Sequence, residues 1–230
     1  MYKYEISKQI EKIAPLKTQE EWDCSGWGVD KKGDDEINKI MLCLTVTDNI
    51  IQQAKEQNCD MIVSHHPCFY IPIEWSDINI YSAHTNLDKA HGGTTDTLID
   101  KLGLSEYKIN TEHDFLRFIE YRINAEDFSK KIKEISPNAR LINNNGIKEF
   151  NKIAFCSGSG SEFIDEAKNL GADCLVTGDL KFHTALDSNI AVYDIGHFES
   201  EIIILPIFEK IIGNKVEFVY AKERSPFLYI

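Results

Sequence analysis

Two stretches of the chain share one pattern, and this pattern constrains the fold more than any other feature. Residues 38–66 align with residues 151–179 at a constant shift of 113 positions, without gaps and with nine identical residues. In each stretch an apolar run typical of a buried strand precedes a helical pattern and a second apolar run. Each stretch therefore predicts a β-α-β unit with parallel strands and a right-handed crossover. Chance similarity between two such units is the alternative to an internal duplication.

The first of these units ends in two adjacent histidines. Residues 61–63 are typical of a buried strand, and His65 and His66 follow shortly after, before Pro67. In open α/β sheets, ligands bind where strands end and loops begin. Because neighbouring side chains at a strand end diverge, each imidazole could hold a separate metal ion. The alternative is that two histidines lie in a loop by chance.

Further candidate ligands follow later strands. Asp88 comes shortly after the predicted strand 78–83 and can enter the same crevice. His197 and Glu201 are four residues apart on a predicted helix, so they share one face and could both reach one metal centre. The sequence therefore predicts a site for two divalent ions, Zn²⁺, Mn²⁺ or Fe²⁺, with Glu201 as the bridging carboxylate. The five candidate ligands are His65, His66, Asp88, His197 and Glu201.

Charge and composition exclude several classes of protein. The 230 residues carry a formal net charge of −12, which argues against general binding to nucleic acid phosphates. No apolar run approaches the roughly 20 residues that cross a bilayer, and the N-terminus lacks the apolar core of a signal peptide. The six cysteines form no C-x-x-C pair, so reduced thiols are expected. We therefore expect a cytoplasmic protein that does not cross a membrane.

The predicted fold class is α/β, with two similar lobes that enclose a dinuclear metal site. Residues 1–110 form the N-terminal lobe with the His-His-Pro motif, and residues 111–150 form a short connecting segment. Residues 151–230 form the C-terminal lobe with a Gly-His-x-x-x-Glu motif; in this lobe a helix over 198–212 and a strand over 216–220 end the chain. Four aromatic residues near the C-terminus are expected in the core, with a subunit interface as the alternative: Phe218, Tyr220, Phe227 and Tyr229.

Five motifs together give the chain a family resemblance. They are Ser64-His65-His66-Pro67, His84-Thr85-Asn86-Leu87-Asp88, Gly92-Gly93, Thr177-Gly178-Asp179 with His183, and Gly196-His197-x-x-x-Glu201. With these motifs the chain resembles the Nif-three-like family, whose members are often labelled GTP cyclohydrolase I type 2 homologues. The resemblance implies two similar α/β lobes facing a dinuclear metal site, a toroidal homohexamer, and metal ligation by the five residues named above.

The chain departs from the family pattern in two places. The N-terminal loop of the family usually has the sequence Trp-Asp-Asn-Ser-Gly followed by an aliphatic residue, whereas this chain has Cys24 and Trp27. If that loop shapes the substrate pocket, the family does not fix the substrate of this chain. The connection over 106–150 is too short for the domain that longer members insert, so this chain is the compact form.

The leading functional hypothesis is a metal-dependent hydrolase that acts on a small anionic or nucleotide-like substrate. Two ions could bind a bridging water and lower its pKa toward neutrality. His84 and His183 are the remaining histidines best placed for proton transfer, with a structural role as the alternative for each. His91 and His113 lack a partner pattern and are expected on the surface. Nothing in the sequence indicates guanine.

Two other hypotheses come from different functional classes. The second is a non-enzymatic metal-binding ring that presents surfaces to partners, with a regulatory or scaffold role. An enzyme needs an open coordination position for water, whereas a structural metal site is closed. The third is a nucleic-acid binder threaded through a ring, and it fits poorly with the net charge of −12.

Overall fold

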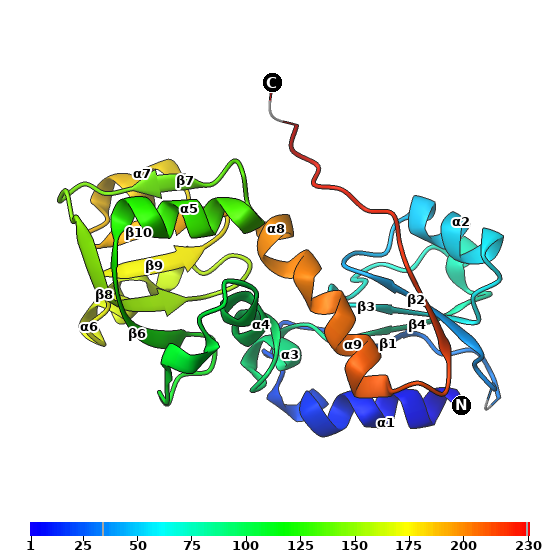
Figure 1. The fold of residues 1–230 in the computed structure, drawn as a ribbon. Coiled ribbons are helices and arrows are strands. Elements are labelled where there is room, and N and C mark those ends of the chain that lie inside the picture. Colours follow the sequence, from blue (N-terminus) through cyan, green and yellow to red (C-terminus); the bar gives the residue numbers. More distant parts are fainter. Residues whose placement is uncertain (34, 229) are drawn as a thin grey trace. The chain divides into compact units, whose positions relative to one another are not determined.

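The computed structural model describes residues 1–33, 35–228 and 230, and it divides into two compact units (Figure 1). The first unit consists of Met1–Gly93 and Ile204–Arg224, and the second of Thr94–Ile203 and Ser225–Ile230. Each unit contains one β-sheet with helices, which confirms the mixed α/β class. Because the chain returns to the first unit near its end, these bounds differ from the ranges expected from the sequence, which are 1–110, 111–150 and 151–230.

The first unit is built on a five-stranded sheet in the order β1-β4-β3-β2-β11. Its strands are β1 (Gly26–Val29), β2 (Lys39–Cys43), β3 (Met61–Ser64), β4 (Asn79–Ser82) and β11 (Glu217–Tyr220). All neighbours are parallel except β1, which pairs antiparallel with β4. The predicted strand over 216–220 exists, but its assignment to the second lobe is wrong, because β11 pairs with β2 of the first unit. A lone strand pattern does not identify its partner.

The α-helices of the first unit, among its described residues, are α1 (Lys3–Ile13), α2 (Asp48–Glu56), α3 (Thr85–Lys89) and α9 (Leu205–Ile212). Thr47 caps α2, because its side chain accepts a hydrogen bond from Ile50 N. The apolar face of α2 packs against Met41 and Cys43 of β2. α1 and α9 contact each other and cover the opposite face of the sheet (Figure 1).

The second unit is built on a six-stranded sheet in the order β5-β6-β8-β9-β10-β7. Its strands are β5 (Lys108–Ile109), β6 (Arg117–Asn124), β7 (Arg140–Ile142), β8 (Glu149–Phe155), β9 (Cys174–Thr177) and β10 (Ala191–Asp194). β8, β9 and β10 are parallel, and the other pairs are antiparallel. One face packs on α4 (Thr94–Lys101) and α5 (Ala125–Ile135), and the other on α6 (Ile164–Asn169) and α7 (Phe182–Asp187).

The segment predicted as one helix over 198–212 is divided into three parts. α8 (His197–Glu201) lies in the second unit, a 3-10 turn follows over Ile202–Ile204, and α9 begins at Leu205 in the first unit. Pro206 occupies the first turn of α9, where a missing N–H breaks no helical hydrogen bond. The break was not predicted because the apolar run over 202–205 continues from the 3-10 turn into α9 without a polar residue. In the described part of the chain, no helix has the length and apolarity that crossing a membrane requires.

The aromatic residues near the C-terminus are less buried than the sequence suggests. Tyr220 is 42% exposed and Phe227 is 66% exposed, so their expected place in the core is wrong. Phe218 is half-buried in β11. Tyr229 lies outside the described residues.

Candidate metal centre

His65 and His66 follow β3 directly, and each is anchored through its Nδ1 atom. His65 is fully buried, and its Nδ1 donates a hydrogen bond to Ala83 O at 2.9 Å. Nδ1 of His66 lies 2.6 Å from Thr45 Oγ1 in a second hydrogen bond. Because Nδ1 is engaged in both rings, Nε2 is the atom that each ring offers for coordination.

Asp88 lies near His65 because of α3, a helix that the sequence did not indicate. α3 starts at Thr85, directly after His84, and its first turn contains Asp88. Oδ1 of Asp88 lies 3.5 Å from Nε2 of His65. The structure therefore brings together two of the predicted ligands within the first unit.

His84 forms a pair with Asp23 in the first unit. Nδ1 of His84 donates a hydrogen bond to Asp23 Oδ1 at 3.1 Å, and the Asp23 side chain is fully buried. Burial alone would raise the pKa of Asp23, but hydrogen bonds from His84, Thr85 and Ser25 and the charge of His84 hold this pKa well below its usual range. Asp23 is therefore ionised at neutral pH.

The three histidine rings of the first unit lie close together. Their centroids are 5.0 Å apart for His65 and His66, 5.2 Å for His65 and His84, and 5.4 Å for His66 and His84. One ring nitrogen from each lies within 4.8 Å of the other two, so the group could hold a metal ion. His84, expected as a proton-transfer candidate, is thus placed beside the predicted ligands.

In the second unit, α8 presents His197 and Glu201 on one face, as their spacing predicts. Nε2 of His197 lies 3.0 Å from Glu201 Oε2, and its Nδ1 lies 2.6 Å from Asp179 Oδ2. Burial alone would lower the pKa of His197, but hydrogen bonds and charges of Glu201 and Asp179 raise this pKa to about 9. A metal ion bound through Nε2 would have to displace a proton.

Gly158 makes room for the Glu201 carboxylate. A Cβ atom at this position would overlap Oε1 of Glu201, and the backbone has a φ of +67°. The N–H of Gly158 also donates a hydrogen bond to Ser200 Oγ at 2.9 Å. Nothing in the sequence indicated this close approach to a candidate ligand.

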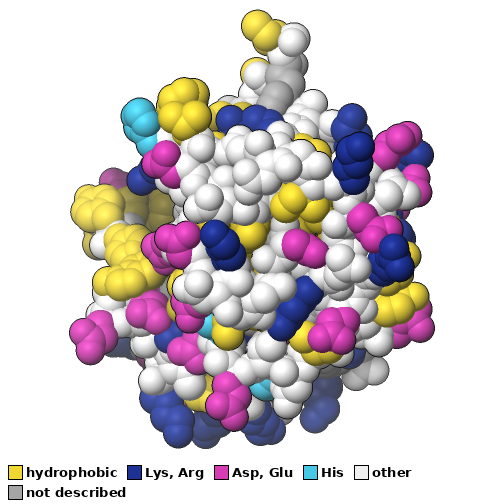
Figure 2. Space-filling view, turned by 90° about the vertical axis from the view of Figure 1, so that its left-hand side faces the viewer, with side chains coloured by type: hydrophobic (Ala, Val, Ile, Leu, Met, Phe, Trp, Pro, Cys, Tyr) yellow, Lys and Arg dark blue, Asp and Glu magenta, His cyan; other side chains and the backbone are white. Residues whose placement is uncertain are grey.

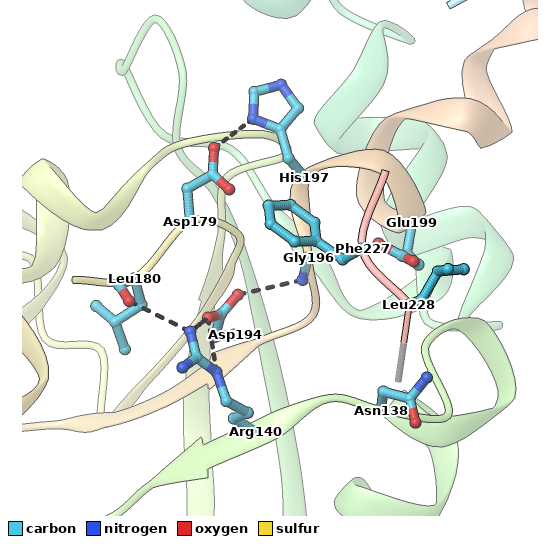
Figure 3. A pocket seen from close by; sticks show the side chains of 10 residues that line it. All are labelled: Asn138, Arg140, Asp179, Leu180, Asp194, Gly196, His197, Glu199, Phe227 and Leu228. Carbon is cyan, nitrogen blue, oxygen red and sulfur yellow. Dashed lines mark hydrogen bonds and ion pairs between the residues drawn. The ribbon is translucent and has the colours of Figure 1, made fainter. Parts of the chain in front are cut away.

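A pocket of about 350 Å³ opens beside His197 within the second unit (Figure 3). In Figure 3 the side chains of Asp179 and His197 point toward each other, and Arg140 reaches toward Asp194. Nε of Arg140 donates a hydrogen bond to Asp194 Oδ2 at 3.1 Å. Phe227, from the C-terminal segment, also lines the pocket. Sequence reasoning missed Arg140 and Asp194 because neither belongs to a recognisable motif.

Among the described residues, the other histidines belong to none of the groups that could hold a metal ion. His183 is exposed on α7 and does not line the pocket. His91 is exposed, as expected. His113 is not a simple surface residue, because its Nδ1 accepts hydrogen bonds from Phe115 N at 3.0 Å and Leu116 N at 2.8 Å. Its role is structural.

Comparison with known proteins points to one family. The family Duf34/NIF3 (NGG1p interacting factor 3) matches residues 1–76 and 73–226. A protein of Clostridium perfringens named GTP cyclohydrolase 1 type 2 homolog is 34% identical, over 98% of this chain and 98% of its own length.

Solved structures share the fold over nearly the whole chain. Reduced HcgD from Methanocaldococcus jannaschii matches with a TM-score of 0.84 and 26% identity, over 97% of this chain and 98% of that one. A Bacillus cereus protein related to NIF3 matches with a TM-score of 0.85 over 100% of this chain and 99% of that one. At 18% identity this second likeness shows the fold alone.

Proposed function

Because the chain belongs to the Duf34/NIF3 family, we propose that it is a metal-dependent hydrolase with two divalent ions per chain. The ions would be Zn²⁺, Mn²⁺ or Fe²⁺, and the substrate a small anionic or nucleotide-like molecule. The proposed ligands are His65, His66, Asp88, His197 and Glu201.

The observation that carries this proposal is the anchoring of the three histidine ligands. In each ring an oxygen atom holds Nδ1, so that Nε2 is the atom through which the ring would bind a cation. The anchors are Ala83 O for His65, Thr45 Oγ1 for His66 and Asp179 Oδ2 for His197. Metal-ligating histidines usually bond an oxygen through their second nitrogen, which fixes the orientation and the tautomer of the ring. The same pattern in both units supports metal binding.

Two carboxylates add to this donor set. Asp88 lies beside His65 in the first unit, and Glu201 lies beside His197 in the second. Glu201 is only 3% exposed, and a buried carboxylate is costly unless a cation or a proton donor accompanies it. Imidazole and carboxylate ligands together suit Zn²⁺, Mn²⁺ and Fe²⁺.

When bound, two divalent ions would supply a water of lowered pKa and positive charge for the anion that develops during hydrolysis. The chain would contribute the pocket beside His197, which suits a small molecule. The pocket contains three carboxylates, from Asp179, Asp194 and Glu199, and one guanidinium, from Arg140. Because Arg140 is paired with Asp194, an anionic substrate would need the charge of the ions.

Proton transfer by His84 or His183 stays a prediction. His183 is the weaker of the two candidates, because it is exposed on α7 and lies outside the pocket lining. His84 is the better placed of the two, because its ring lies beside those of the proposed ligands His65 and His66.

The alternative function is a metal-binding ring without turnover, and exposed apolar side chains support an assembly. Phe69, Tyr70 and Ile73 of the first unit are 69%, 79% and 77% exposed. Phe182 and Leu186 of α7 are 74% and 61% exposed. Figure 2 shows hydrophobic side chains along one edge of the face in view, among interspersed acidic and basic ones. Such patches suit subunit contacts, so we propose a homo-oligomer, with the toroidal hexamer as the form that the resemblance implies.

We also propose that the two units contain a duplicated β-α-β segment. Ile40 of β2 pairs with Met61 of β3, and Ile153 of β8 pairs with Cys174 of β9. Both pairs obey the shift of 113 that aligns the sequences, so the strand register supports the duplication.

A cytoplasmic location is part of the same proposal. Cys43 and Cys174 are buried thiols rather than disulfides. Reduced thiols in the core suit a reducing compartment.

Turnover distinguishes the hydrolase from the ring. The metal-loaded protein is incubated with nucleoside mono-, di- and triphosphates, beside Glu201→Gln and the exposed control His91→Ala. The hydrolase predicts product release that Glu201→Gln lowers by roughly 100-fold or more and His91→Ala leaves unchanged. Stable binding of two ions without turnover of these substrates would favour the ring assembly.

A further inference from the structure

The carboxylate of Glu223 joins two neighbouring backbone N–H groups in the loop after β2. Oε1 accepts a hydrogen bond from Leu44 N at 2.7 Å, and Oε2 accepts one from Thr45 N at 3.1 Å. Glu223 is half-buried, and it lies 178 positions after Thr45 in the chain. The contact is therefore a product of the fold rather than of the local sequence.

These two N–H groups lie just beyond the pairing of β2 with β11. Ala221, directly after β11, still donates its N–H to Leu42 O at 2.9 Å. Beyond this bond the side chain of Glu223, rather than a strand, supplies the acceptors for Leu44 and Thr45. Leu44 is only 3% exposed, and a buried N–H group without an acceptor is costly. The carboxylate therefore stabilises this loop.

The segment that contains Glu223 is fixed on α2. Lys222 N donates a hydrogen bond to Gln53 Oε1 at 2.8 Å, and Gln53 Nε2 donates one to Lys222 O at 3.2 Å. Gln53 belongs to α2, which packs against β2. The carboxylate is therefore held in place by the same β-α-β segment whose loop it contacts.

The loop that Glu223 holds also contacts a proposed ligand. Leu44 O accepts a hydrogen bond from His66 N at 2.8 Å, and Thr45 Oγ1 lies 2.6 Å from His66 Nδ1. His65 contacts the preceding residue instead, because its N–H donates to Cys43 O at 3.2 Å. A shift of Leu44 and Thr45 would therefore move His66 more than His65.

The second unit holds the equivalent N–H group in a comparable way. Gly158 corresponds to Thr45 at the shift of 113, and its N–H donates to Ser200 Oγ at 2.9 Å. Ser200 lies in α8 between the proposed ligands His197 and Glu201. In both units this N–H group therefore links the loop to a residue that supports the candidate ligands. The acceptor is a hydroxyl in the second unit and a carboxylate, which is a stronger acceptor, in the first.

We propose that Glu223 is a positioning residue for the metal ligand His66: its carboxylate fixes Leu44 and Thr45, and these two residues fix the imidazole. This inference rests on the metal binding proposed above, and it adds a residue outside the five ligands named there. Residues that support a metal ligand typically change the affinity for metal by 10- to 100-fold. Because Glu223 acts on His66 through a second residue, we expect an effect of about 10-fold.

Stepwise removal of Zn²⁺ from the loaded full-length chain by a chelator of known affinity tests the inference. Glu223→Gln retains one acceptor oxygen and turns an NH₂ group toward the other N–H, so one hydrogen bond is lost. Because His65 and His66 are expected to hold separate ions, the affinity for one ion should fall by about 10-fold and that for the other should stay within about twofold. Glu223→Asp keeps the charge but can reach only one N–H group, so it should weaken the same ion by a smaller factor.

Glu217→Gln is the matched control, because it makes the same substitution in β11. The side chain of Glu217 is 61% exposed and pairs with Lys39 at 2.8 Å, so both ions should bind within about twofold of the wild type. The double variant Thr45→Val, Glu223→Gln should resemble Thr45→Val alone, because the hydroxyl of Thr45 links Glu223 to the imidazole.

Long-range ¹H–¹⁵N spectra of the imidazoles give a readout that a general loss of stability would not move. In the Zn²⁺-loaded chain, Glu223→Gln should shift the ring nitrogen signals of His66 and leave those of His65 in place. Glu217→Gln should shift neither set.

The outcomes separate this inference from the proposed function. A wild-type chain that binds no Zn²⁺ would overturn both. A wild-type chain that binds two ions, with Glu223→Gln unchanged in affinity and in the His66 signals, would overturn only the role of Glu223. Equal weakening of both ions by Glu223→Gln, or an equal effect of Glu217→Gln, would show that the carboxylate stabilises the unit as a whole and does not position His66.

Discussion

The two β-α-β segments share a backbone plan, yet equivalent positions serve their candidate ligands in opposite ways. Thr45 of the first unit corresponds to Gly158 of the second at the shift of 113. The hydroxyl of Thr45 anchors His66, whereas the missing side chain of Gly158 leaves space for Glu201. The equivalent position therefore supports a ligand through a hydroxyl group in the first unit and through the absence of a side chain in the second.

The strand ends differ in the same manner. β3 leads into His65 and His66, which are candidate ligands themselves. β9 leads into Gly178 and Asp179, and Asp179 anchors a ligand that comes from α8. The backbone plan thus sets where polar groups gather, and the residue type decides whether a position supplies a ligand or supports one.

Gly158→Ala is expected to have the largest effect on this comparison. The new Cβ would displace the Glu201 carboxylate, and its backbone strain would cost about 1–2 kcal/mol. Elemental analysis should show the metal content falling from two ions per chain to one or fewer. Gly146→Ala is the control, because it has a similar φ of +63° with open space around it. Equal metal content in the two variants would show that Gly158 has no role in placing Glu201.

Thr45→Val tests whether the hydroxyl of Thr45 supports a candidate ligand in the first unit. Loss of the hydroxyl removes the anchor of His66, so the affinity for metal should fall by roughly 10- to 100-fold. Competition with a chelator of known affinity measures this change. Thr45→Ser keeps the hydroxyl and should bind within a fewfold of the wild type. If the valine and serine variants bind equally well, the anchor is not important.

The charged anchor of His197 predicts a pH dependence for the metal-free protein. The folded-state pKa of about 9 lies above the ordinary value of 6.5, so the stabilisation from Glu201 and Asp179 is fully present below about pH 6.5. It should be lost as the pH rises toward 9. Urea unfolding between pH 6 and 10 should show a difference in free energy between wild type and His197→Gln that shrinks over this window. A constant difference would mean that the ion pairs of His197 do not stabilise the fold.

The smallest expected effect concerns the turns after α2 and α6. Asn58 and Gly171 occupy equivalent positions with φ values of 54° and 87°. Asn58→Gly should raise the free energy of unfolding by no more than about 1 kcal/mol, and Gly171→Asn should lower it by a similar amount. Urea titrations measure both. Strong destabilisation by Asn58→Gly would reveal a stabilising role for the asparagine side chain, which Gly171 at the equivalent position does not have.

Local patterns predicted much of the fold and part of the candidate site. The parallel β-α-β order follows from two apolar runs on either side of a helical pattern, which are properties of adjacent residues. The contact between His197 and Glu201 follows from helix geometry alone. These features need no knowledge of distant contacts.

Features that depend on distant contacts could not be predicted. β11 lies far from β2 along the chain, and their pairing is decided by packing rather than by local sequence. α3 is only five residues long, which is too short for a helical period to show. Asp23 was recognised only as part of a loop, because its link to His84 spans 61 positions.

The most direct test of the proposed dinuclear site is the number of metal ions per chain, measured by elemental analysis of the purified protein beside the double variant His65→Ala, Glu201→Ala. A dinuclear site predicts close to two ions per wild-type chain and their loss in the variant. A wild-type protein without metal, even after incubation with Zn²⁺ or Mn²⁺, would contradict it. The histidines would then be structural residues, and the family relationship would describe the fold alone.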